Sequence, residues 1–286
     1  MPLDREEYIE QAYFFRSFRE RLEENIPSQE VLSCIHEEVL STTKLPMAIE
    51  FLRGELSHHG GIGEGMKRLP HYFTPFQAYV LQKSEEDRAR FDQRVALEVL
   101  QREAEYRAGA VSSAGLFIYQ FEAISRNRLG YDQGMSAIAE DPQYDEVWRS
   151  WIRRARLHLG TIDFADLIWF HSEQWLVDRK RQLRDDTVVA EQPVLFGIKE
   201  GRIAAANRGR DPLYMFAALQ RQLGYPTVPR ARMQEGTERL LKQFDGKIKE
   251  LEKRIQILEA EAKGKLDLTE FIVKDPTFTD EGFSRG

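Results

Sequence analysis

Apolar residues recur at three- and four-residue steps along most of the chain, which predicts a mainly helical protein. The first such stripe runs from about residue 5 to residue 24 and includes Phe14 and Phe18. The triplet Thr74, Pro75 and Gln77 has the order of an N-cap, a first-turn proline and a capping-box partner. Further periodic segments lie at about 28–56, 74–107 and 113–126. We expect residues 1–126 to form a helical bundle, with 74–107 as one long helix.

Residues 127–230 read as a mixed region. Trp148, Trp151 and Ile152 share one helical face, which favours packing into a core over stacking of bases on a surface. Asp141-Pro142 is expected to cap the helix that carries them, and Asp211-Pro212 to cap another that Gly224 closes. The segment 163–183 favours a helix, although the apolar run 167–170 is also compatible with a short strand.

One place in this region has the pattern of a sheet. The runs 194–198 and 203–207 contain β-branched or small residues, and they are separated by Lys199-Glu200-Gly201-Arg202. A short connection that contains glycine is typical of a hairpin. The expected fold class is therefore α+β: mainly α with one small β-hairpin at about 194–207.

The C-terminal region carries a heptad repeat, which predicts a coiled-coil helix over 231–264 and a flexible tail over 265–286. Isoleucine at a with leucine at d favours parallel dimers. The flanking g residues Lys247 and Arg254 are basic, and the e residues five positions later are Glu252 and Glu259. The same stripe would also suit a helix that packs on its own domain. The expected oligomerisation positions are Leu241, Phe244, Ile248, Leu251, Ile255 and Leu258, with Ala262 completing the pattern.

Composition narrows the class of protein. The chain has 286 residues, of which 42% are apolar and 31% charged, so it can fill a core and is not of the disordered type. The formal net charge of −6 makes nucleic-acid binding an unfavoured prediction, despite arginine-rich helices at 149–156 and 179–184. No apolar run reaches the roughly 20 residues of a membrane-spanning helix. The polar N-terminus does not resemble a signal peptide, and the single Cys34 fits a reducing compartment, so we expect a cytoplasmic protein.

Candidate chemistry concentrates in the histidine- and glycine-rich loop 55–71. Glu55 and His58 have the Glu-x-x-His spacing of metal ligands on one helical face, and His59 is a further candidate ligand. A divalent metal is the one cofactor that the sequence suggests. Lys67 and Arg68 follow four glycines, a composition compatible with a phosphate or anion site. Flexible-loop and helix-end roles explain the same residues without a ligand.

Two functional hypotheses follow. The first is a non-catalytic adaptor or scaffold that forms a homodimer through the coiled coil and contacts a protein partner. The alternative is a metal- or nucleotide-dependent enzyme with its site in the loop 55–71. No nucleophile motif or paired cysteine motif is present in the sequence, so the first hypothesis is preferred, with no cofactor predicted.

Overall fold

The computed structural model describes residues 2–86, 91–187, 189–190, 192–230, 247–248 and 255. Contacts divide the chain into two units, residues 1–231 and residues 232–286. The first unit holds nearly all of the described residues. The domain boundaries expected from the sequence stay predictions.

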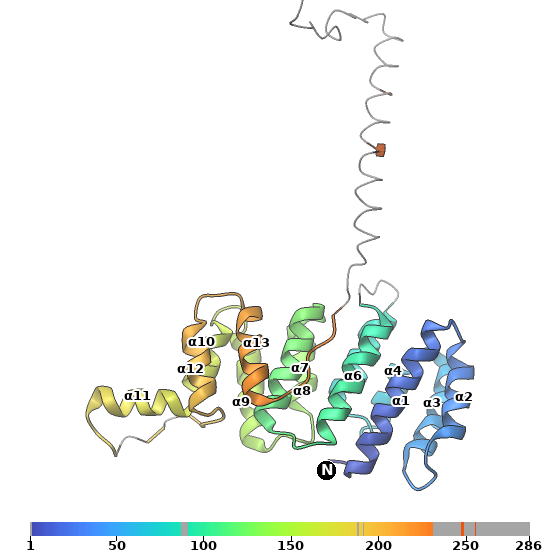
Figure 1. Ribbon diagram of the computed structural model, residues 1–286, viewed down its shortest axis with the longest axis horizontal. Coiled ribbons are helices and arrows are strands. Elements are labelled where there is room, and N and C mark those ends of the chain that lie inside the picture. Colours follow the sequence, from blue (N-terminus) through green and yellow to red (C-terminus); the bar gives the residue numbers. More distant parts are fainter. Residues whose placement is uncertain are drawn as a thin grey trace, which may run out of the picture. The chain divides into compact units, whose positions relative to one another are not determined.

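The described part of the first unit is built from helices, which confirms the mainly α class (Figure 1). No helix among the described residues is both long and apolar enough to cross a membrane. The bundle arrangement of residues 1–126 stays a prediction. The helices are α1 (Arg5–Glu23), α2 (Ser28–Glu38), α3 (Leu45–His59), α4 (Gly63–Lys67), α5 (Pro75–Glu85), α6 (Gln93–Arg107), α7 (Ser113–Asn127), α8 (Tyr131–Ala139), α9 (Glu146–His158), α10 (Phe164–Phe170), α11 (Glu173–Leu183), α12 (Ile198–Ala206) and α13 (Pro212–Leu223).

Local sequence signals explain many helix ends. Thr74 and Gln77 form the expected capping box at the start of α5, and Asp211 accepts a hydrogen bond from the Leu213 N–H at the start of α13. Gly224 ends α13 in the left-handed conformation at φ 69°, where a residue without Cβ is favoured. Asp145, and not Asp141, caps α9 by accepting from the Trp148 N–H at 2.8 Å.

The predicted hairpin at 194–207 is wrong. Its first half is extended and pairs with the segment after α10, where the Leu195 and Phe196 N–H groups donate to the carbonyl of His171 at 2.8 and 3.1 Å. Its second half is the helix α12, because the alanines after Ile203 are strong helix formers. Among the described residues the β pairing amounts to two isolated bridges, Leu159–Ile162 and Ser172–Phe196. The adjoining segment 163–172 is helical as favoured, with α10 over most of it.

The single helix expected over 74–107 is also wrong, because the structure has two helices there. The α5 helix ends at Glu85, and Glu86 is extended with ψ 133°. Phe91 is buried, and the Asp92 carboxylate caps α6 by accepting from the Arg94 N–H at 2.7 Å. Burial of Phe91 and the cap at Asp92 therefore favour the start of a new helix over continuation of α5.

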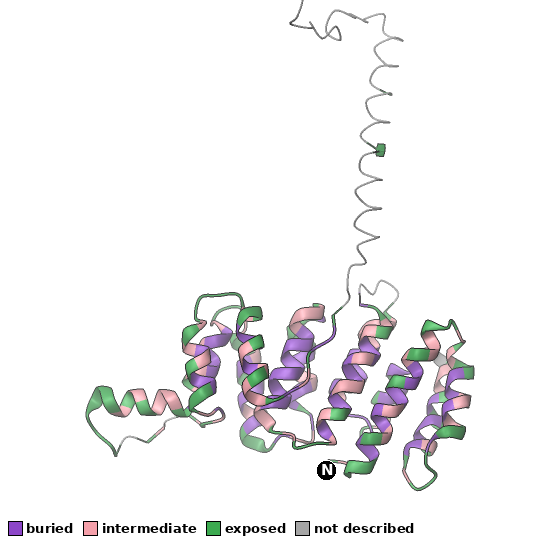
Figure 2. Ribbon diagram, in the orientation of Figure 1, coloured by how far each residue is buried: buried purple, intermediate pink, exposed green. Residues whose placement is uncertain are grey.

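One hydrophobic core runs through the described residues of the first unit, from Ala12 to Val228 (Figure 2). At its N-terminal end α1 packs along α6. In its central part, aromatic rings from α7, α9 and α10 meet, with Phe117 edge-on to Trp151 at 4.9 Å and Phe121 stacked on Phe164 at 3.9 Å. Trp148 and Trp151 are both buried, as their shared helical face predicts.

A buried charge cluster joins α6 and α7 to the segment after α8. Arg107 donates to Glu103 at 2.9 Å and to both carboxylate oxygens of Asp141. Gln120 donates to Glu103 at 2.7 Å and to Asp141 at 3.0 Å, and the Tyr144 hydroxyl donates to Gln120. All five residues are buried. The cluster therefore ties segments more than thirty residues apart into one core.

Candidate functional site

The glycine-rich loop is filled by a side chain of the protein itself. Glu85, at the end of α5, accepts hydrogen bonds from the backbone N–H groups of Ile62 and Gly63, both at 2.9 Å. Burial raises the pKa of this carboxyl above its ordinary value, and the two N–H groups oppose the rise. A Cβ at Gly61 would lie 2.8 Å from the Glu85 carboxylate, and one at Gly63 would lie 2.7 Å from the Gln82 backbone nitrogen. The glycines thus allow α5 to approach, and a carboxylate occupies the place of the expected phosphate.

The two basic residues after the loop have carboxylate neighbours. Arg68 forms an ion pair with Glu55 at 3.1 Å, and Lys67 lies 3.9 Å from Glu64. Both pairs are partly exposed, so each contributes little to stability. Anion binding by Lys67 and Arg68 stays a prediction, and an incoming anion would compete with these carboxylates.

Two of the proposed metal ligands, Glu55 and His58, lie near the C-terminal end of α3. Glu55 faces Arg68. Within the described ranges, no group of three or more His, Cys, Asp or Glu residues could hold a metal ion. The side chain of His59 lies outside the described residues. The metal site at Glu55, His58 and His59 therefore stays a prediction without structural support.

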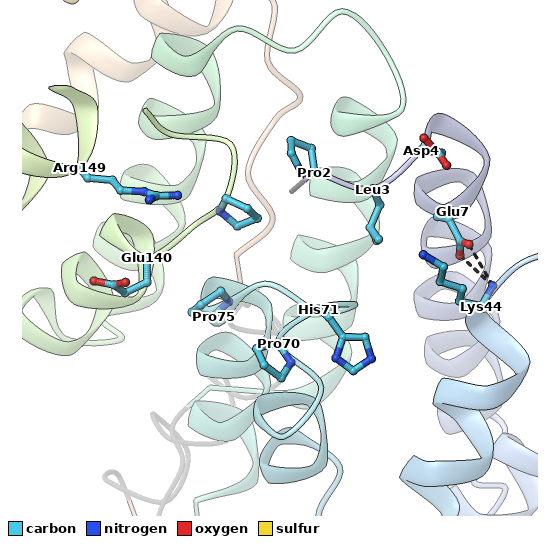
Figure 3. A pocket seen from close by; sticks show the side chains of 11 residues that line it. Pro2, Leu3, Asp4, Glu7, Lys44, Pro70, His71, Pro75, Glu140 and Arg149 are labelled. Atoms are coloured by element: carbon cyan, nitrogen blue, oxygen red, sulfur yellow. Dashed lines mark hydrogen bonds between the residues drawn. The ribbon is translucent and has the colours of Figure 1, made fainter. Parts of the chain in front are cut away.

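A polar pocket of about 690 Å³ is bordered by the N-terminal segment, the residue before α3, the segment between α4 and α5, and the residues that follow α8 (Figure 3). Two of its carboxylates have partners within the protein. Glu7 accepts from the backbone N–H of Lys44 at 3.0 Å, and Glu140 pairs with Arg153 at 2.8 Å. The lining residues are Pro2, Leu3, Asp4, Glu7, Lys44, Pro70, His71, Pro75, Glu140, Pro142 and Arg149. Of the predicted loop 55–71, only its last residues, Pro70 and His71, reach this pocket.

A second pocket of about 540 Å³ has aromatic walls, and its charges are also paired. Arg156 donates to Ser136 at 2.7 Å and lies 3.5 Å from Asp132. Asp163 caps α10 and accepts from the Gly209 N–H at 2.6 Å. These side chains hold neighbouring segments in place, so they are poorly available to a ligand.

A third pocket, of about 290 Å³, combines aromatic walls with basic groups, and we refer to it as the aromatic-basic pocket. In this pocket the ring centroid of His171 lies 5.5 Å from that of Trp151. The His171 Nδ1 forms a hydrogen bond with the Leu167 carbonyl at 2.9 Å. Burial lowers the pKa of His171 below its ordinary value, and the Arg154 charge lowers it further. The lining residues are Trp151, Arg154, Ala155, His158, Ile162, Leu167, Phe170, His171, Trp175 and Gln192.

Two of the expected oligomerisation positions are described, namely Ile248 and Ile255. Both are helical, and they are 53% and 54% exposed. Leu241, Phe244, Leu251 and Leu258 lie outside the described residues. Self-association through this segment is therefore still a prediction.

Sequence reasoning missed Glu85 and the aromatic-basic pocket for the same reason. Glu85 is over twenty residues from the loop that it fills, and the pocket combines α9, α10, α11 and Gln192. The concentration of tryptophan and arginine between 148 and 175 was the one available signal for the pocket.

Comparison with known proteins adds no relative to this picture. The chain matches no family model, no curated protein and no solved structure.

Proposed function

We propose that this protein is a non-catalytic adaptor or scaffold that forms a homodimer through the heptad segment 241–258. The observation that carries the proposal is the pair Ile248 and Ile255, one heptad apart, both helical and both about half exposed. Covering the exposed half of an isoleucine contributes on the order of 1 kcal/mol. A second copy of the same helix offers complementary isoleucines at the same two a positions.

Charge supports a parallel arrangement. In a parallel pair the g residue of one helix faces the e residue five positions later on the other. Lys247 would then face Glu252, and Arg254 would face Glu259. In an antiparallel pair g faces g, which would place these basic residues together and disfavour that arrangement.

Dimerisation would present the helical unit of residues 1–231 twice. A partner with two or more copies of the recognised surface would bind such a pair more tightly than a single copy, because the second contact forms at a high effective concentration. This gain requires no further contact surface, and it gives the coiled coil a role in an adaptor.

The test uses two double variants of the full chain that add the same charge. Ile248→Lys with Ile255→Lys places lysines on the seam, whereas Gln256→Lys with Ile257→Lys places them on the outer b and c positions. Light scattering after size exclusion should give twice 33.4 kDa for wild type and the control, and 33.4 kDa for the seam variant. A monomeric wild type, or a seam variant that stays dimeric, would contradict the proposal.

A further inference from the structure

The aromatic-basic pocket is lined by an arginine whose charge is not paired inside the described part of the protein. Among the residues that the structure describes, the Arg154 guanidinium has no ion-pair or hydrogen-bond partner, although it lines the pocket. In the second pocket, by contrast, Arg156 and Asp163 are each bonded to a neighbouring group. An exposed cation that lines a pocket and has no internal partner is available to an anion.

The ionisable lining groups of this pocket are all basic. They are Arg154, His158 and His171, and the lining residues that the structure describes include no aspartate or glutamate. The Arg154 guanidinium carries a permanent positive charge and no described lining carboxylate opposes it, so the pocket favours an anionic group near Arg154. A guanidinium matches a carboxylate well, because it can donate two parallel hydrogen bonds.

The remaining walls are apolar and largely aromatic. Phe170 is 44% exposed and Ile162 36%, and the half-buried Trp175 closes the side formed by α11. Flat rings prefer offset-stacked or edge-to-face contact with other rings. The exposed apolar surface beside Arg154 therefore suits a planar ring better than a flexible polar chain.

Size restricts the ligand further. A cavity of about 150 Å³ is enough for one benzene ring. The pocket measures about 290 Å³, which leaves room for one ring and a short acidic side chain. We propose that the aromatic-basic pocket binds a small aromatic carboxylate, with the ring against Phe170 and Trp175 and the carboxylate on Arg154.

The experiment titrates phenylacetate into the full-length protein by calorimetry, with the neutral phenylacetamide as the matched ligand. Arg154→Gln tests the anchor, and Arg153→Gln is its control, because Arg153 is the adjacent arginine but pairs with Glu140 outside the pocket. Trp175→Ala tests the aromatic wall. Circular dichroism establishes that each variant is folded, which is expected because both arginines are exposed.

We expect saturable phenylacetate binding with a Kd of about 1 mM or tighter. Arg154→Gln and the change to phenylacetamide should each weaken binding about tenfold or more, Trp175→Ala should weaken it severalfold, and Arg153→Gln should change it less than about twofold. Absence of saturable binding would overturn the proposal. Equal losses in the two arginine variants would also overturn it, since they would show attraction to surface charge alone. Binding of the amide as tight as that of the acid would exclude Arg154 as the anchor.

Discussion

At the scale of residues, the buried cluster around Arg107 shows that the contribution of a charge to stability depends on its burial and its partners. Two carboxylates, Glu103 and Asp141, share the one guanidinium of Arg107 without access to water. Desolvation raises the pKa of Glu103, with the Asp141 charge acting in the same direction and Arg107 opposing it. The cation is thus the essential member, because its loss would leave two buried carboxylates unpaired.

Substitutions in this cluster should therefore have unequal effects. Arg107→Gln should lower the free energy of unfolding by about 3–5 kcal/mol. Glu103→Gln should change it by less than about 1 kcal/mol, because the amide oxygen can still accept from Arg107 and a buried charge is removed. Urea unfolding of the two variants and wild type measures both values. Similar losses in both variants would contradict this assignment of roles.

The raised pKa of Glu103 also predicts how the stability of the protein depends on pH. A carboxyl whose folded-state pKa is raised stabilises the fold most fully below its unfolded pKa, and this contribution is lost as the pH rises through the folded pKa. Glu103→Gln removes the group, so the free energy of unfolding measured above pH 4 should depend less on pH in this variant than in wild type.

Asp141 was expected to cap a helix and is instead a partner of Arg107. The sequence pattern could not indicate this, because Arg107 lies 34 positions away.

At the scale of elements, α12 explains why the hairpin prediction failed. Gly201 was interpreted as a turn residue, yet it lies inside a helix and in close contact with the N-terminus of α11. A Cβ there would lie 2.3 Å from the Ser172 Oγ and 2.7 Å from the Gln174 Cβ. The glycine is therefore explained by the approach of two helices, a tertiary feature to which local turn statistics do not respond.

Two glycine substitutions within helices test this explanation. Gly201→Ala should destabilise the protein by about 1–3 kcal/mol through overpacking, although alanine is the better helix former. Gly54→Ala in α3 is the control, because no atom beyond its chain neighbours and the backbone of its own helix lies within 4 Å of its Cβ position, and it should stabilise by up to about 1 kcal/mol. Thermal unfolding compares them. A stabilising Gly201→Ala would show that the close contact with Ser172 does not constrain α12.

The successes and failures of the sequence analysis separate by the range of the interaction. The capping box at Thr74 and the end of α13 at Gly224 were predicted correctly, because each depends on residues within a few positions. The break between α5 and α6 depends on burial of Phe91, and the filling of the glycine loop depends on Glu85. Neither contact is indicated by a periodic pattern in the sequence.

At the scale of the whole molecule, the proposed dimer can be tested by reversing the sign of the charged residues at its g and e positions. Lys247→Glu with Arg254→Glu makes the g–e contacts 247–252 and 254–259 of a homodimer acidic on both sides. Glu252→Lys with Glu259→Lys makes the same contacts basic on both sides. Each variant alone should therefore dimerise weakly, because like charges face each other along both flanks of the seam.

Mixing the two charge variants should restore the dimer. In the mixed parallel pair each new glutamate at g faces a new lysine at e. On the other flank, the unchanged Lys247 and Arg254 of one variant face the unchanged Glu252 and Glu259 of the other, as in wild type. Native mass spectrometry of an equimolar mixture should give a one-to-one heterodimer at low salt. The preference should fall toward 1 M salt, where the Debye length is about 3 Å and exposed pairs are screened. Two variants that remain monomeric when mixed would contradict a parallel, in-register coiled coil, and two variants that each dimerise as wild type does would show that these flanking charges do not face one another.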